Sequence, residues 1–193
     1  MDWRPWALVG LGSLAILEVA NRGGPWTGGA FGAKWLFRAG IMYLVFGAVT
    51  ARGSPMTVRR AVGSAIGALI VAVLIGFPTL YYGRVVTPPH EPLGGVVLRE
   101  AVYALVLSPI PAGYVAGVLA REGRPGRAVS LLLGAIFAGG VGTIHMLGIV
   151  LGNGTGLGKA LIMATSFVAG GAALPALVIM SRPARAQGPT PSE

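Results

Sequence analysis

The sequence predicts an all-α, polytopic transmembrane helix bundle of about six spans, packed through small residues. Charged residues make up 11% of the 193-residue chain, whereas a soluble domain has about a quarter. Apolar residues make up 54% and fall into runs of the length that crosses a bilayer. The chain also holds 32 glycines, which weaken helices in water by about 1 kcal/mol each but let helices approach closely in lipid. The abundant Val, Leu and Ile exclude a glycine-rich disordered chain.

Six apolar segments meet, or nearly meet, the requirement of about 20 residues for a span. They are residues 6–20, 35–51, 61–82, 98–120, 128–151 and 160–180. The first is the weakest because it is short and carries Glu18 near its end, so a cleaved signal peptide or an interfacial helix remains open. Residues 1–185 are expected to form the transmembrane bundle, and residues 186–193 a disordered cytoplasmic tail.

The basic residues indicate an orientation. The net charge of +9 comes from short clusters between the apolar runs, so nucleic acid is excluded as a partner. By the positive-inside rule, one set of loops is cytoplasmic together with both termini, and the membrane is expected to be the plasma membrane. The cytoplasmic set is Arg4, Arg52, Arg59, Arg60, Arg121, Arg124, Arg127, Arg182 and Arg185. The remaining basic residues are Arg22, Lys34, Arg38, Arg84, Arg99 and Lys159.

A short pattern recurs along the chain and suggests helical-hairpin repeats. Gly53-Ser-Pro55 and the following Arg60-Ala-Val match Gly123-Arg-Pro125 and Arg127-Ala-Val. Duplicated hairpins of this kind occur in some transporters. Chance matching in a chain rich in alanine and glycine is the alternative.

Small residues also recur every fourth position, which places them on one stripe of a helix. This spacing predicts close packing by protein around the third, fifth and sixth spans. The residues concerned are Gly63, Gly67, Gly134, Ala138, Gly142, Gly148, Gly152, Ser166 and Gly170.

Proline interrupts two of the predicted spans. Ser108-Pro-Ile-Pro111 lies in the middle of the fourth span, and Pro175 lies in the sixth. Each proline removes a backbone donor, and lipid tolerates the freed carbonyls only where protein or a water-lined cavity satisfies them. Interrupted helices near the midplane are typical of transport sites. Ser108, Pro109, Pro111 and Pro175 are therefore candidate substrate-binding residues, and an ordinary proline kink is the alternative.

Ionisable residues near the outer ends of the spans are the remaining candidates. Arg38 lies one helical turn deeper in the second span than a flanking residue needs, and it is placed to meet Glu18 or Glu100. The three residues form either a polar vestibule for a solute or a collar of snorkelling side chains with interfacial aromatics. We include Arg38, Glu100 and Glu18 among the candidate substrate-binding residues.

No catalytic or cofactor motif is present in the sequence. There is no cysteine, no HExxH and no Ser-His-Asp pattern, so no catalytic residue, metal or cofactor is expected. His145 is read as a structural histidine, with a ligand or proton-relay role as the alternative. The glycine-rich run ending at Lys159 departs from the phosphate-binding loop at Asn153 and Ala160, which excludes nucleotide binding.

The sequence thus favours a small transporter, or a membrane-embedded transport component, for a small solute. An accessory subunit that packs into a larger membrane complex is the alternative, and an enzyme acting on lipid is a weaker third. The expected partners are the lipid bilayer and either other membrane subunits or further copies of the chain.

Overall fold

The computed structural model describes residues 2–22, 30–86, 90–150 and 157–181. Within these ranges, the side chains of residues 16–22, 30–34, 79–80, 83–84, 146–150 and 157–167 lie outside the description. The predicted tail, residues 186–193, also lies outside the described residues.

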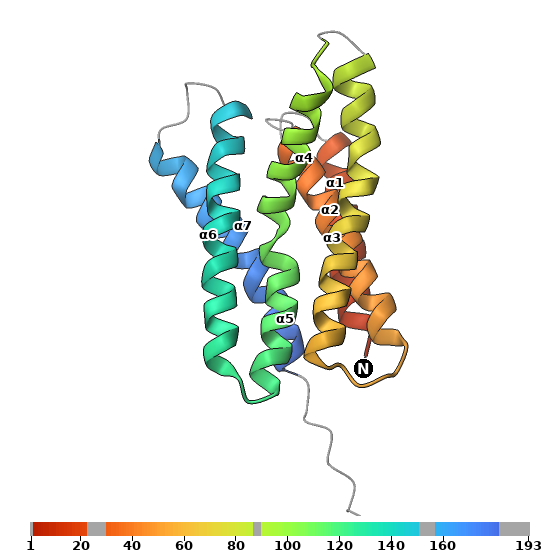
Figure 1. The fold of residues 1–193 in the computed structure, drawn as a ribbon. Coiled ribbons are helices and arrows are strands. Elements are labelled where there is room, and N and C mark those ends of the chain that lie inside the picture. Colours follow the sequence, from red (N-terminus) through yellow and green to blue (C-terminus); the bar gives the residue numbers. More distant parts are fainter. Residues whose placement is uncertain (1, 23–29, 87–89, 151–156, 182–193) are drawn as a thin grey trace, which may run out of the picture.

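The described part of the chain is helical and contains no strand, which confirms the all-α prediction. Figure 1 shows the helices running roughly side by side. In chain order they are α1 (Arg4–Arg22), α2 (Ala30–Ala51), α3 (Val58–Tyr81), the π-helical η2 (Tyr82–Val86), α4 (Leu93–Leu107), α5 (Pro109–Arg121), α6 (Pro125–Val150) and α7 (Leu157–Met180).

Three stretches of the described chain are long and apolar enough to cross a membrane, namely Val58–Pro78, Leu93–Arg121 and Pro125–His145. At 1.5 Å per residue, a stretch of 21 residues extends about 30 Å, the thickness of the hydrocarbon core. Two further helical stretches, Trp35–Ala51 and Val168–Met180, are apolar but shorter. These lengths support a chain that associates with the membrane.

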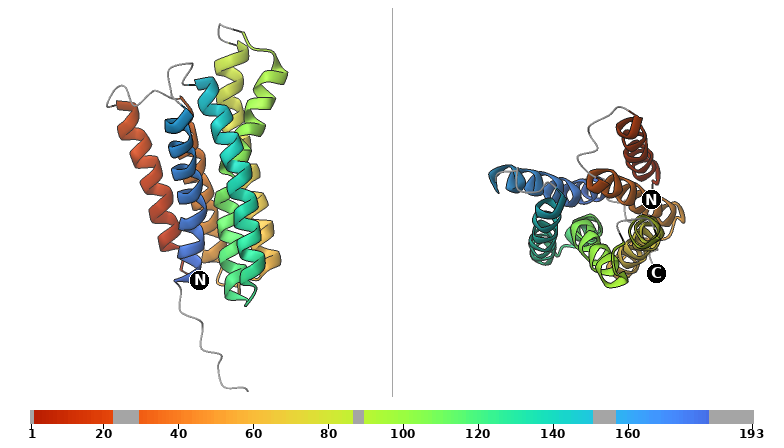
Figure 2. Two further views of the ribbon diagram at one scale, coloured as in Figure 1. Left: turned by 90° about the vertical axis from the view of Figure 1, so that its left-hand side faces the viewer. Right: turned by 90° about the horizontal axis from the view of Figure 1, so that it is seen from above.

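The segment formed by α4 and α5 is the centre of the fold. Of its most apolar window, 78% of the residues are buried, against 33% for α3 and 22% for α6. α5 packs against α7, α6 and α3, and α1 packs mainly against α2. The view from above in Figure 2 shows α1 at the periphery, beside α2. The outer faces of α3 and α6 are left exposed and apolar, as a lipid-facing or partner-facing surface requires.

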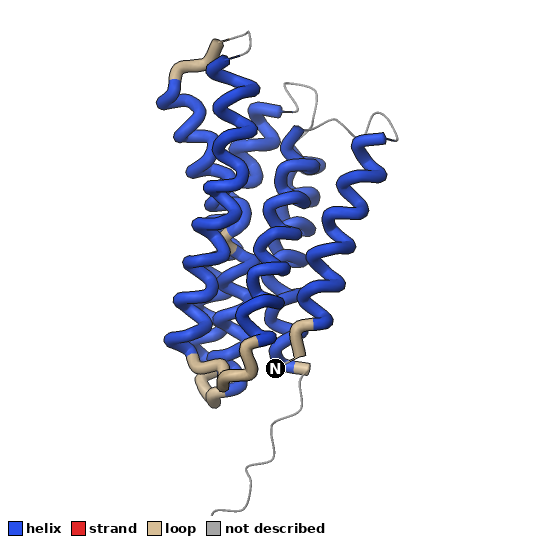
Figure 3. The backbone as a smooth tube through the Cα atoms, turned by 90° about the vertical axis from the view of Figure 1, so that its right-hand side faces the viewer, coloured by secondary structure: helices blue, strands red, loops and turns tan. Residues whose placement is uncertain are grey.

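The helix break expected at the paired prolines is confirmed at Ser108, which separates α4 from α5. It appears in Figure 3 as a short loop segment at mid-height. Ser108 itself keeps helical dihedrals (φ −53°, ψ −31°), so the chain kinks without unwinding. Pro109 cannot donate to the Leu105 carbonyl, and Ser108 takes over that acceptor through its N–H at 3.2 Å and its Oγ at 2.7 Å.

At Pro175 the expected interruption is absent, because α7 continues from Leu157 to Met180. A single proline removes only one hydrogen bond, and its ring is directed at the carbonyl four residues back. That residue is Gly171. The loss of this one hydrogen bond does not end α7.

Glycines do bring helices together, but largely at positions other than the predicted stripes. A Cβ on Gly113 would collide with the Ala172 carbonyl, so α5 and α7 are in backbone contact there. A Cβ on Gly10 would lie 2.9 Å from the Gly40 carbonyl oxygen, which joins α1 to α2. Among the predicted positions, Gly142 is close-packed, with an added Cβ 3.1 Å from Leu105 Cβ.

The predicted packing at Gly63, Gly67, Gly134 and Gly170 is wrong, since an added Cβ at each would meet no described atom within 4 Å. Four-residue spacing places residues on one stripe of a helix, but it does not decide whether that stripe faces inward. Gly152 lies outside the described residues, as do the side chains of Gly148 and Ser166.

The turns after α2 and α5 lie at the same end of the bundle, and each contains a glycine with positive φ. Gly53 (φ 68°) and Gly123 (φ 74°) both adopt the left-handed conformation that glycine favours. Glu122 Oε1, from the second turn, accepts a hydrogen bond from the Val58 N–H at 3.0 Å. The Glu122 side chain, from the turn between α5 and α6, thus caps the first turn of α3.

Candidate functional site

A buried ion pair joins α2 to α4. Arg38 Nη2 lies 2.5 Å from Glu100 Oε1. Arg38 is 1% exposed and Glu100 is 4% exposed. They are the only ionisable side chains among the buried polar and charged residues of the described chain. The others are Thr50 and Thr143, and each donates to a carbonyl of its own helix.

Three helices enclose the Arg38 guanidinium. Its Cζ lies 4.1 Å from the centroid of the Tyr103 ring in α4, in cation–π geometry. On the α3 side the guanidinium lies against the backbone of Gly76, where an added Cβ would collide with Nε, Cζ and Nη2. Only glycine leaves enough room at this position of α3. Sequence reasoning missed Gly76, although it continues a four-residue stripe with Ala68 and Ala72, both of which are buried.

The shell around the pair is apolar. The core cluster on this side is Val96, Val102, Tyr103 and Val106, with Trp35, Phe77 and Val85 packed against it. A low-dielectric shell strengthens the attraction between the two charges and raises the cost of separating them.

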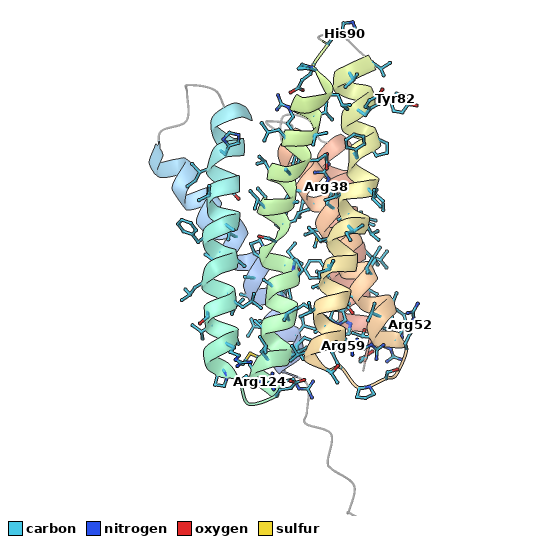
Figure 4. The ribbon with its side chains drawn as sticks, viewed as in Figure 1. Arg38, Arg52, Arg59, Tyr82, His90 and Arg124 are labelled. Carbon is cyan, nitrogen blue, oxygen red and sulfur yellow. The ribbon has the colours of Figure 1, made fainter. Side chains whose placement is uncertain are left out.

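The pair lies deep relative to the ends of the bundle. Arg38 is 13 residues from the end of α2 at Ala51, or about 20 Å along the helix axis. Figure 4 places Arg38 between the end that carries Arg52, Arg59 and Arg124 and the end that carries Tyr82 and His90. Arg38 is also eight residues from the start of α2 at Ala30, or about 12 Å along the helix axis.

One nitrogen of the Arg38 guanidinium, Nη1, makes no hydrogen bond within the described chain. This nitrogen is buried. The contact with Glu100 is therefore made at one nitrogen, whereas arginine can hold a carboxylate with two parallel hydrogen bonds. A buried donor left without an acceptor costs about 1–3 kcal/mol, so its presence calls for an explanation.

The predicted site residues fall into two groups. The structure brings Arg38 and Glu100 together. The side chain of Glu18, the other predicted partner of Arg38, lies outside the described residues. Ser108 is eight residues beyond Glu100, or about 12 Å along the helix. Pro109, Pro111 and Pro175 are buried, and Pro109 packs tightly against Gly139 of α6.

Trp35 connects the two groups. Its ring packs on the apolar shell of the ion pair and on the main core cluster. The same ring also lies beside Gly171 of α7. A Cβ added to Gly171 would be 3.7 Å from the Trp35 ring and 3.4 Å from the Ile110 side chain. The structure places Trp35 in contact with the core.

A second ion pair lies at the start of α4. Arg99 Nε lies 2.9 Å and 3.1 Å from the two Glu91 oxygens, and both side chains are partly exposed. His90 Nδ1 lies 3.0 Å from the Val85 carbonyl oxygen. A partly exposed pair of this kind contributes little to stability.

No group of three or more His, Cys, Asp or Glu side chains that could hold a metal ion occurs in the part of the chain that is described. His145 is exposed on α6. Comparison with protein-family models, with curated proteins and with solved structures finds no match to this chain.

Proposed function

We propose that the protein is a small transporter, or the membrane-embedded component of one, and that it acts on a small solute. The observation that carries the proposal is the buried Arg38–Glu100 pair within an apolar helical bundle. Ionisable residues in membrane spans are costly and typically mark solute or ion pathways. The pair also lies on the same polypeptide stretch as the break at Ser108, an arrangement found at transport sites.

The proposal includes a six-span bundle in the plasma membrane with both termini on the cytoplasmic side. Its support is the distribution of arginine. Five exposed arginines lie in the two turns that carry Gly53 and Gly123 or in the adjoining helix ends, namely Arg52, Arg59, Arg121, Arg124 and Arg127. None of these arginines forms an ion pair with another described residue. The positive-inside rule assigns such a surface to the cytoplasm.

We place the solute site around Arg38 and Glu100, with the helix break at Ser108 about 12 Å further along the same stretch of chain. α5 and α7 are in backbone contact at Gly113, so little space remains between them for a solute. On the α2–α3–α4 side, by contrast, a buried cation is present whose Nη1 makes no hydrogen bond within the described chain.

Uptake into proteoliposomes tests this assignment. The solutes would be those that co-purify with the protein, identified by mass spectrometry of gently extracted material. Replacement of Arg38 by Gln together with Glu100 by Gln removes both charges and leaves a neutral pair, so the bundle is expected to fold and uptake is expected to stop. Uptake at the original rate in this double variant would refute the site.

A second candidate function is an accessory subunit in a larger complex. It is favoured by the outward-facing Gly63, Gly67 and Gly134, which pack against no described residue. Small residues on an outer face allow another helix to approach closely. Purification in mild detergent separates the two functions, because an accessory subunit would carry stoichiometric foreign chains or lose its fold without them.

A further inference from the structure

The Nη1 nitrogen of Arg38 points to the kind of solute. It belongs to a side chain that is 1% exposed and is surrounded by three helices. Packing alone does not require a charged residue here, since an apolar residue of similar volume would fill the same space at lower cost. A guanidinium with one nitrogen engaged and one free has the geometry to receive a two-oxygen anion.

We propose, building on the transport function above, that the solute is a carboxylate monoanion. One oxygen of the solute binds Arg38 Nη1. The other binds Arg38 Nη2, where it replaces Glu100 Oε1. Glu100 takes up one proton as it leaves the guanidinium. One proton is therefore bound with each carboxylate.

Charge balance in the apolar shell supports the proton step. The pair of Arg38⁺ and Glu100⁻ has a net charge of zero. If a carboxylate binds while Glu100 stays ionised, the shell holds one excess negative charge, which costs several kcal/mol in a low-dielectric interior. If Glu100 is protonated instead, the shell again has a net charge of zero. The neutral acid also gains an O–H donor that can satisfy a nearby carbonyl.

The same charge balance favours a monoanion over a phosphate dianion as the solute. A phosphate dianion would leave one net negative charge on the Arg38–Glu100 pair even with Glu100 protonated, because the pair itself supplies a single positive charge. The titratable neighbour from α4 is Tyr103, whose ring lies 4.1 Å from Arg38 Cζ. On α3, Phe77 packs on the apolar shell and Tyr81 stacks on Phe77, with ring centroids 6.1 Å apart. Arg99, next to Glu100 in sequence, forms its ion pair with Glu91. Its charge is therefore balanced by Glu91 and not by a solute bound at Arg38.

Binding of carboxylates to the purified protein tests the proposal. The probes are the sodium salts of acetate, lactate and benzoate, with acetamide, lactamide and benzamide as uncharged analogues of matched shape. The readout is tryptophan fluorescence, because Trp35 packs on the shell. At least one carboxylate should bind and its amide should not. The dissociation constant of that carboxylate should rise with pH, by up to about tenfold per pH unit, since one proton enters with each anion.

Two variants make the test specific. Glu100→Gln mimics the protonated acid, so carboxylate binding should persist and lose its pH dependence. Arg38→Gln with Glu100→Gln keeps a neutral pair and should weaken binding by at least about tenfold, because the charged hydrogen bonds are lost. If Glu100→Gln alone does not fold, the double variant still tests the proposal. Carboxylate binding of unchanged affinity in the double variant would overturn it.

The outcomes separate the solute class from the transport function. Proton-linked carboxylate binding without uptake into proteoliposomes would support the binding site and refute transport. Arg38-dependent uptake of a neutral or cationic solute would support transport and overturn the carboxylate. Absence of binding by every carboxylate probe, or binding with no pH dependence in the unaltered protein, would also overturn it.

Discussion

Replacement of Gly76 by alanine is expected to disrupt the ion pair from a helix that contributes neither charge. The added Cβ would occupy the space now held by the Arg38 guanidinium. Because the guanidinium is the end of a flexible side chain, it can move, but it then leaves Glu100 Oε1 at 2.5 Å and the Tyr103 ring at 4.1 Å. The backbone of α3 need not shift.

The magnitude follows from two opposing terms. Disrupting a buried pair so that a charge remains uncompensated costs about 3–5 kcal/mol. Alanine in place of glycine favours a helix by about 1 kcal/mol. The free energy of unfolding should therefore fall by about 2–4 kcal/mol. Gly67→Ala, on the same helix, is the matched control, because its Cβ meets no described atom within 4 Å. It should leave stability unchanged or raise it slightly.

Reversible unfolding in mixed detergent micelles, followed by circular dichroism, measures both variants. If Gly76→Ala proves as stable as Gly67→Ala, the guanidinium does not occupy the position described, and the reasoning about the pair fails. A double-mutant cycle with Arg38→Gln gives a second check. Once the guanidinium is absent, the alanine at 76 should cost much less than it does alone.

Three further changes probe the frame around the site by the same unfolding measurement. Ser108→Ala removes the hydroxyl that satisfies the carbonyl freed by the kink and should cost about 1 kcal/mol. Glu122→Ala removes the cap on the Val58 N–H and should cost about 0.5–2 kcal/mol; no change would mean that water replaces the carboxylate. Gly113→Ala should be more damaging than either, since its Cβ would collide with backbone, whereas Gly170→Ala should be tolerated.

The sequence was sufficient for the helical class and for the kink, because both depend on local chemistry. Two prolines within four residues remove donors wherever the helix lies, so the break at Ser108 could be predicted. The Arg38–Glu100 contact was one of two pairings considered. The choice between them depends on how α2 and α4 are placed, which spacing along one helix does not determine.

The positions at which glycine matters could not be predicted. Gly63 and Gly67 have the spacing of a packing stripe, yet they face outward. The stripe of Ala68, Ala72 and Gly76 has the same spacing, and it is the one that faces inward, with Gly76 against the guanidinium. The difference arises from the rotation of α3 about its own axis, which is set by contacts with α2, α4 and α5. A hydrophobic pattern that is apolar on all sides carries little information on that rotation.

The hydrogen bond from the Val58 N–H to Glu122 has a mechanical consequence for the proposed transport. This hydrogen bond connects the turn after α5 to the start of α3 at the arginine-bearing end. The ion pair connects α2 to α4 nearer the opposite end. When a solute replaces Glu100, the ion pair is broken and the hydrogen bond is kept. The arginine-bearing end would then act as the pivot, and the helices would part first at the end that carries Tyr82 and His90.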